Sequence, residues 1–129
     1  MIEAACVLDD RGTVIHWHLP QGRTGAMLPD SRELWLVLWE HRSRLGAVAH
    51  THPWTGEALP SATDVTTFAA CEAALGRRLV WSIVTADQCA CFSWLGPGRL
   101  DYASVPCPNL RESDIARLRE LSQDSLSNS

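Results

Sequence analysis

The sequence predicts an α+β fold in which a mixed β-sheet is flanked by helices within one domain. Apolar strand patterns and longer helical patterns follow one another in the order β-β-α-β-α-β-β-β-α, which combines hairpins with helix-linked strands. The length of 129 residues suits one domain. Hydrophobic and charged residues make up 46% and 20% of the chain, which is typical of globular domains and excludes a largely disordered chain, a coiled coil and a collagen-like fibre.

The N-terminal part of the chain predicts a hairpin followed by a helix. Residues 4–9 are apolar, residues 13–19 alternate, and a turn-forming Asp-Asp-Arg-Gly segment separates them. Asp30 or Ser31 is a suitable N-cap for a helix that we expect to reach about Arg44. A run of apolar residues in this helix, flanked by Arg and Glu, indicates that it is buried on most sides.

The middle of the chain predicts a central strand and a second helix. Gly46 opens a strand of small residues at 47–50, and small side chains favour a central strand that is closely covered on one face. A helical pattern begins at Ser61 and runs to Leu75, where Gly76 provides a typical C-terminal signal.

The C-terminal part predicts three strands and a third helix. Residues 79–86 and 89–95 form a second hairpin, residues 100–105 a further strand and residues 112–121 a terminal helix. We therefore expect one domain over 1–108, a C-terminal helix within 109–121 that packs on this domain or extends it, and a disordered polar tail at 122–129.

The composition excludes several functional classes. The longest apolar run, Leu34–Trp39, has six residues, whereas a membrane-spanning helix needs about 20. The first residues lack the basic and apolar pattern of a secretion signal, so we expect a cytoplasmic protein without a membrane partner. The net charge of −4 and the lack of a basic stripe interleaved with aromatic residues argue against a nucleic-acid partner.

Cysteine and arginine usage carry two further expectations. The five cysteines, at positions 6, 71, 89, 91 and 107, form no Cys-x-x-Cys pair, and in a cytoplasmic chain they are expected to be buried free thiols. All eleven basic residues are arginine. A GC-rich genome is the simpler explanation, and avoidance of lysine beside a protein-conjugation system is the alternative.

A His-Thr-His-Pro segment followed by Pro-Ser-Ala-Thr-Asp carries the clearest chemistry. His50 and His52 lie two residues apart at the end of a predicted strand, so both side chains point to the same face. Asp64 lies twelve residues beyond His52, at the start of the next helix. Two imidazoles and one carboxylate, with a position left for water, are typical of a catalytic zinc site. Taken alone, the spacing of Ser61 and Asp64 also fits a plain capping box.

Three other residues near this pattern have competing interpretations. His16 and His18 form a second His-x-His pattern, but we expect them to lie on a solvated strand face. Trp54 follows the His-Pro pair directly, and it lies either at the substrate cleft or against the core as a loop anchor.

The motifs resemble the signature of the JAMM (MPN+) zinc metalloproteases, in which a Glu precedes His-x-His-Pro and Pro-Ser-x-x-Asp. The resemblance covers roughly residues 2–105 and is strongest to the short prokaryotic JAB branch. Eleven residues separate His52 from Asp64, one more than is usual in that family, and we place the extra residue in the Trp54–Leu59 loop. The resemblance implies an MPN/JAB-like mixed sheet with a cytidine-deaminase-like layout.

The resemblance also implies roles for single residues. The ligands of one Zn²⁺ per chain would be His50, His52 and Asp64. Glu3 matches the Glu-x-x-x-φ-φ pattern before the first strand and would be the general base, while the Ser61 hydroxyl would stabilise the tetrahedral intermediate. Glu57 and Glu40 are the alternative bases.

By the same resemblance, we expect a zinc isopeptidase or peptidase that cleaves after the Gly-rich C-terminus of a ubiquitin-like protein. Its partners would then include activating- and conjugating-enzyme homologues. The alternatives are a peptidase that processes a sulfur-carrier protein and releases a small amine such as cysteine, and a non-catalytic MPN scaffold. We expect the substrate tail to add as a strand beside His50–Pro53, since no apolar cleft can be recognised in the sequence.

Overall fold

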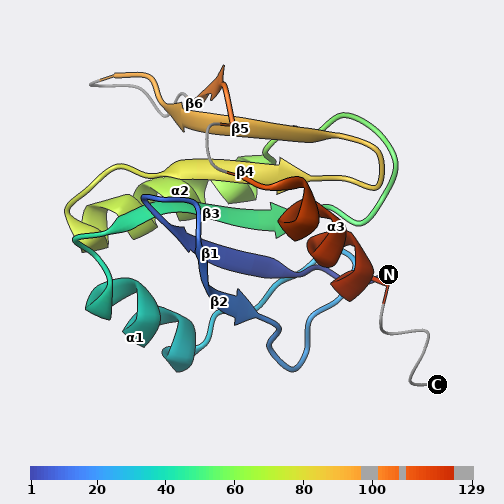
Figure 1. The fold of residues 1–129 in the computed structure, drawn as a ribbon, viewed down its shortest axis with the longest axis horizontal. Coiled ribbons are helices and arrows are strands. Elements are labelled where there is room, and N and C mark those ends of the chain that lie inside the picture. Colours follow the sequence, from blue (N-terminus) through green and yellow to red (C-terminus); the bar gives the residue numbers. More distant parts are fainter. Residues whose placement is uncertain (97–101, 108–109, 124–129) are drawn as a thin grey trace.

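The computed structural model describes residues 1–96, 102–107 and 110–123, which form six strands and three helices (Figure 1). The strands are β1 (Ala5–Asp9), β2 (Val14–His18), β3 (Leu45–Thr51), β4 (Val80–Val84), β5 (Cys89–Trp94) and β6 (Tyr102–Val105). The helices are α1 (Arg32–Glu40), α2 (Ala62–Leu75) and α3 (Glu112–Leu121). The predicted element order and the single-domain α+β class are confirmed.

All six strands belong to one mixed sheet in the order β2-β1-β3-β4-β5-β6. β3 lies inside this sheet, antiparallel to β1 and parallel to β4, and every other neighbouring pair is antiparallel. The parallel strands β3 and β4 are joined through α2, because parallel neighbours need a long crossover connection. A Cβ atom at Gly46 would clash with the carbonyl oxygen of Asp9, so glycine permits the close approach of β1 and β3 at this point.

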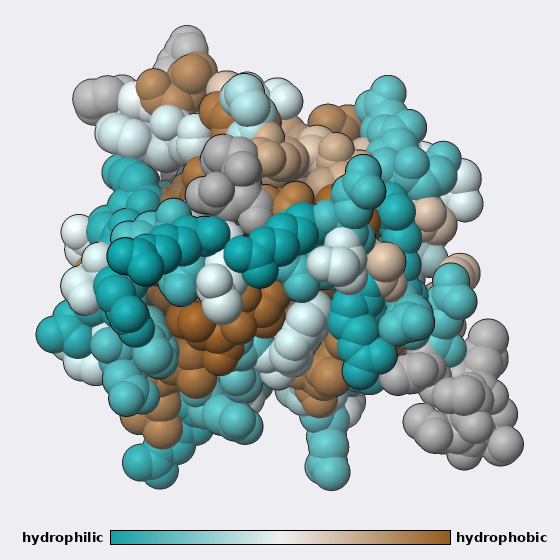
Figure 2. Space-filling view, in the orientation of Figure 1, coloured by the Kyte–Doolittle hydropathy of each residue, from teal (hydrophilic) through white to brown (hydrophobic). Residues whose placement is uncertain are grey.

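Helices cover both faces of the sheet. α1 and α2 share one core with the sheet, whose buried members are Val7, Leu38, Leu45, Phe68, Cys71, Leu75, Leu79 and Trp81. α3 covers the opposite face through a second core, made of Ala4, Cys6, Leu8, Ala49, Val84, Leu118 and Leu121. Consecutive β1 residues alternate between the two cores, as strand pleating requires. α3 lies in front of the sheet in Figure 1, and hydrophobic surface remains visible near the middle of this side in Figure 2.

α1 is shorter and less buried than the sequence predicts. It begins after Ser31, which is its N-cap, and it ends at Glu40, before the predicted Arg44. The outward residues Leu36 and Trp39 are 56% and 52% exposed. The expectation of a helix buried on most sides is wrong, because α1 lies against the edge strand β2 and contacts the domain with only one face.

The cysteines differ from the prediction of five free thiols. Cys91 on β5 forms a disulfide with Cys107, which follows β6. Cys6 and Cys71 are free and buried, and Cys89 is free and half-buried. The disulfide could not be predicted from spacing, because it depends on the β5–β6 register, which brings the chain after β6 alongside Cys91.

Parts of three predictions lie outside the described residues: 100–101 of the sixth strand, residue 109 of the terminal segment and 124–129 of the tail. Ser122, the first residue of the predicted tail, is buried and continues the backbone hydrogen bonding of α3. Within the described residues, no helix is long and apolar enough to cross a membrane.

A buried carboxylate joins α2 to the strands beside it. Glu72 is 2% exposed. It accepts hydrogen bonds from the Leu79 N–H at 2.8 Å, from Trp81 Nε1 at 3.0 Å and from Arg78 at 3.0 Å, and it also binds the Tyr102 hydroxyl. These donors replace the water that Glu72 loses on burial, and they link α2 with β4 and β6.

We expect Glu72→Gln to lower the free energy of unfolding by about 2–4 kcal/mol, because an NH₂ group replaces an acceptor and faces buried donors. Urea unfolding followed by tryptophan fluorescence measures the change. The control is Glu120→Gln, which removes an exposed ion pair with Arg117 and should leave stability nearly unchanged. Equal effects of the two substitutions would contradict the role assigned to Glu72.

Candidate metal centre

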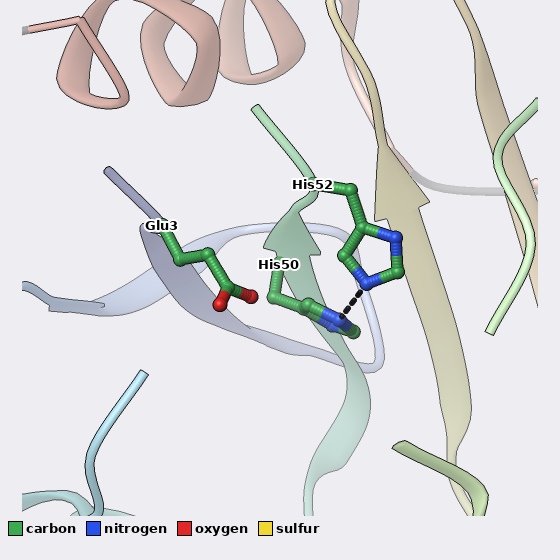
Figure 3. A group of neighbouring side chains, drawn as sticks. All are labelled: Glu3, His50 and His52. Atoms are coloured by element: carbon green, nitrogen blue, oxygen red, sulfur yellow. Dashed lines mark hydrogen bonds between the residues drawn. The ribbon is translucent and has the colours of Figure 1, made fainter. Parts of the chain in front are cut away.

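His50 and His52 lie at the end of β3 and are brought together on one side of the sheet (Figure 3). His50 lies opposite Ala5 of β1, and the His52 N–H donates to the carbonyl of Val84 at 2.9 Å, which prolongs the strand pairing beyond Thr51. The backbone therefore stays extended, and alternate side chains keep the same direction. Both histidines are buried, with 8% and 6% of their surface exposed.

Thr51, between the two histidines, points to the opposite face of the sheet, where its hydrogen bonds stabilise the end of β3. Its hydroxyl oxygen accepts the Ala4 N–H at 2.9 Å and the hydroxyl of Ser122 at 2.6 Å. It is 1% exposed. One threonine therefore ties the end of β3 to the segment before β1 and to the end of α3.

Asp64 reaches the histidines from the first turn of α2. The Ser61 Oγ accepts the Asp64 N–H at 3.0 Å, and Asp64 Oδ2 accepts the Ser61 N–H at 2.9 Å, which makes a complete capping box. The same carboxylate contacts both imidazoles. The capping-box and ligand interpretations of this motif are therefore compatible, because the cap fixes the orientation in which Asp64 meets the histidines.

The two histidines and Asp64 form a closed triangle of polar atoms. The Nε2 atoms of His50 and His52 lie 3.2 Å apart, and the Asp64 oxygens lie 3.3 Å and 3.0 Å from them respectively. Each Nε2 carries either one hydrogen or one lone pair, so hydrogen bonds cannot satisfy both contacts of each nitrogen at once. A cation at the centre of the triangle satisfies all three groups together.

The separations in this triangle fit zinc. Tetrahedral Zn²⁺ with bonds of about 2.0–2.1 Å places neighbouring ligand atoms about 3.3 Å apart. The Nε2–Nε2 separation of 3.2 Å lies close to this value. Each imidazole meets a different oxygen of Asp64, His50 meeting Oδ1 at 3.3 Å and His52 meeting Oδ2 at 3.0 Å. The residues present therefore fit a zinc ion held by three protein ligands, with one position left for another group.

Glu3 approaches the histidines from the neighbouring strand (Figure 3). It lies two residues before Ala5, the partner of His50, and is 7% exposed. The ligand atoms of Glu3, His50 and His52 all lie within 4.8 Å of one another, so this group could also hold a metal ion. Asp64 also contacts both Nε2 atoms, at 3.3 Å and 3.0 Å, so either carboxylate could be the third ligand.

The backbone of Glu3 is held firmly, although it is the third residue of the sequence. Its N–H donates to the carbonyl of Thr24 at 2.7 Å, and its carbonyl accepts a hydrogen bond from Arg23 at 3.3 Å. The preceding Ile2 N–H donates to the carbonyl of Ser122 at 2.8 Å. The segment before β1 is therefore anchored on both sides of Glu3.

The two carboxylates of the site have opposite pKa shifts. Burial raises the pKa of Glu3, and the charge of Asp64 adds to this rise, while His50 and His52 oppose it. Burial also acts to raise the pKa of Asp64, but hydrogen bonds with both imidazoles and with the Ser61 N–H outweigh it and hold that pKa well below its usual range. Asp64 is therefore the more acidic of the two carboxylates.

The candidate metal centre lines a cleft of about 800 Å³ that extends between α1 and α2. Its floor is formed by the sheet residues Ala5, Val7, Val48 and Trp81, and its walls include Leu34, Trp35 and Leu38 of α1 and Thr67, Phe68 and Cys71 of α2. Sequence analysis missed this cleft, because each of these apolar patterns is also typical of a closed core. The uninterrupted apolar run of α1 was the available signal.

The remaining candidate residues lie at different distances from the site. Trp54 lines the cleft, is 47% exposed and stacks on His52 with ring centroids 4.8 Å apart. Ser61 and Glu57 also line the cleft. Glu40 is exposed at the end of α1, and it is not one of the residues that line the cleft in the part of the chain that the structure describes.

The expectation that His18 is solvated is wrong. His18 is 4% exposed and lines the cleft, and its Nε2 lies 2.7 Å from the carbonyl oxygen of Pro29. Burial lowers the pKa of His18, against the opposing effect of this hydrogen bond. The reason for the difference is the segment after β2, which returns over the strand and covers the imidazole.

The expected strand edge beside His50–Pro53 is also wrong. β3 is paired with β1 on one side and with β4 on the other. At its end, the Thr51 N–H donates to Ala4 and the His52 N–H donates to Val84. Both sides of the strand at the histidines are therefore occupied, and a peptide cannot add there as a further strand.

Neither a scan against protein-family models nor a search of curated proteins finds a match for this chain.

We expect the purified protein to bind about one zinc per chain, because two imidazoles and one carboxylate already converge with separations of 3.0–3.3 Å. Mass spectrometry of the metal content measures it. His50→Ala and His52→Ala should each lose the metal, while His16→Ala, which alters the other His-x-His pattern, should retain it. A wild-type protein that stays metal-free after incubation with zinc would show that the assignment is wrong.

Proposed function

We propose that the protein is a zinc-dependent hydrolase of amide bonds, a peptidase or isopeptidase of the JAMM type. The single observation that carries this proposal is the convergence of His50, His52 and Asp64 beside the buried Glu3. Two imidazoles and one carboxylate leave an open coordination position, which distinguishes catalytic zinc sites from structural ones. A bound zinc ion would lower the pKa of water to about 7 and polarise a carbonyl oxygen.

Glu3 is the general base in this proposal. A carboxylate oxygen of the buried Glu3 lies within 4.8 Å of a ring nitrogen of each histidine, so a water held at the open position would be within its reach. In such a site, Glu3 would accept a proton from this water and would later deliver it to the leaving amine.

Ser61 is the proposed donor to the oxyanion. Its oxygen accepts the Asp64 N–H through a lone pair, so its own O–H remains available to another acceptor. It lies in the lining of the cleft. The N-cap geometry that orients Asp64 therefore also fixes Ser61 beside the place where the scissile carbonyl would lie.

The proposed substrate class is the Gly-rich C-terminal tail of a ubiquitin-like protein. Glycines let the backbone approach a buried metal centre closely, because they carry no side chain. The buried positions of His50 and His52 support a substrate segment that is thin at the scissile bond. Under this proposal, activating- and conjugating-enzyme homologues are the expected partners in the cell.

We expect Glu3→Gln to lower kcat by about 10²–10⁴-fold, because it removes the proton acceptor. Zinc content should stay at the wild-type level, since Asp64 and the two histidines are intact. Cleavage of a fusion of a ubiquitin-like protein, followed by gel electrophoresis, measures turnover. Glu57→Gln is the matched control and should keep most of the activity. A reversed result, with Glu57→Gln inactive and Glu3→Gln active, would move the base into the loop.

Ser61→Ala should lower kcat by about 10²–10³-fold through loss of the oxyanion donor. The substitution also removes a helix N-cap, so its effect on folding needs a control. Ser31→Ala provides one, because Ser31 caps α1 by accepting the Leu34 N–H at 3.0 Å and is not among the described lining residues of the cleft. Both variants should lose about 1 kcal/mol of stability, but only Ser61→Ala should lose activity. Similar activity losses in both would assign the effect to folding.

A further inference from the structure

We propose that the cleft beside the metal centre binds one large, uncharged apolar side chain of the substrate, within a few residues of the bond that is cleaved. This inference rests on the proposed hydrolase function, because the cleft matters for specificity only if a substrate reaches the metal centre.

The cleft is continuous with the metal centre. His50, His52 and Asp64 line the same cavity as Leu38 of α1 and Trp81 of β4, which belong to the core that the sheet shares with α1 and α2. Its volume of about 800 Å³ is within the range of sites for small organic ligands and exceeds the volume of one amino-acid side chain. A substrate whose scissile bond lies at the metal can therefore place a neighbouring side chain in the cleft.

Exposed apolar side chains gather along the cleft. Met27, Trp35, Trp54 and Leu59 are between 37% and 55% exposed, and all four line it. Exposed apolar groups that converge on one cavity favour a ligand that covers them. Aromatic and flexible apolar side chains are also the types that most often anchor a bound apolar group.

The charges of the cleft exclude an anionic occupant. Four carboxylates line it, and they belong to Glu3, Asp30, Glu57 and Asp64. None of the lining residues that the structure describes is an arginine. Away from the metal centre, an acidic side chain would therefore lose its water without gaining a cationic partner, which favours an uncharged group there.

The sheet topology supports recognition through a side chain. β3 is paired on both sides at His50 and Thr51, so main-chain pairing beside the metal centre cannot supply affinity. Contacts in the cleft must then contribute most of the binding energy near the scissile bond. A tail made only of glycine would leave the cleft empty.

The test uses blocked hexaglycine peptides in which one Phe, or one Glu, is moved through the six positions. Binding to the zinc-loaded wild type and to zinc-loaded Glu3→Gln is measured by calorimetry, and kcat/KM is measured on the wild type. We expect Phe in at least one position to bind at least tenfold more tightly than hexaglycine, because a buried Phe contributes strongly to binding. We expect Glu at the same position to bind more weakly than glycine.

Two substitutions on α2 separate the cleft from the rest of the surface. Ala70 is exposed and lines the cleft, whereas Ala73 is exposed on the same helix but lies outside the described lining. Ala70→Trp should remove the preference for Phe, and Ala73→Trp should keep it. If Ala70→Trp fails to fold, Thr67→Asp replaces it as the test. This substitution adds a negative charge at an exposed position of the cleft wall. It should lower the affinity for the Phe peptide by about as much as is expected for Ala70→Trp.

The outcomes distinguish this inference from the proposed function. Equal binding of the Phe, Gly and Glu peptides, with Glu3-dependent hydrolysis intact, would overturn the cleft inference alone. Tighter binding of the Phe peptides that depends on Ala70, without hydrolysis of any peptide or fusion, would support the cleft and overturn the hydrolase. A preference for Phe that survives Ala70→Trp and Thr67→Asp would also overturn the cleft inference.

Discussion

The pairing of the first residues of β1 with the end of β3 is the interaction on which the candidate site depends. Ala5 lies opposite His50, and the Ala4 N–H donates to the hydroxyl of Thr51. This register places Glu3 in the same layer as the two histidines and turns Thr51 toward α3. A slip of one residue would move every side chain of the segment to the other face and separate Glu3 from the histidines. The geometry of the site thus depends on the strand register. The buried Thr51 stabilises this register from the opposite face of the sheet.

The two carboxylates of the site, the buried Glu3 and the half-buried Asp64, differ in how far their charges are compensated. Asp64 accepts the Ser61 N–H and meets two imidazoles, so its charge is compensated within the protein. The two histidines near the carboxylate of Glu3 act to lower its pKa, but burial outweighs them and raises this pKa. A cation in the triangle of His50, His52 and Asp64 would relieve the crowding of their polar atoms. Metal binding and local stability are therefore expected to be coupled, as in other sites where ligands must lose protons before they bind.

Local patterns were sufficient to predict most elements of this fold, and contacts between distant segments were not. The helix that begins at Ser61 and ends at Gly76 has explicit capping signals, and the structure has both. The disulfide of Cys91 depends on the register of two strands, and the burial of His18 depends on a segment that returns over β2. Neither contact produces a periodic pattern in the sequence from which it could be predicted. The ligand motif could be recognised because all its residues lie within one strand, one loop and one helix start, whereas the cleft required the packing of α1.

The apolar run of α1 shows how one pattern can predict the wrong environment for a sound physical reason. A helix with apolar residues on several sides is expected to be buried, because exposed apolar surface has no compensating interaction in water. In this protein Leu34 and Leu38 meet the core or its cleft, while Trp35 lies at the cleft and is 37% exposed. The helix therefore uses its apolar side chains to build an open wall beside the metal centre instead of a closed core. Under the proposed function, this arrangement would place substrate recognition at the side chains between α1 and α2 and not at the edge of the sheet, because β3 is already paired at His50.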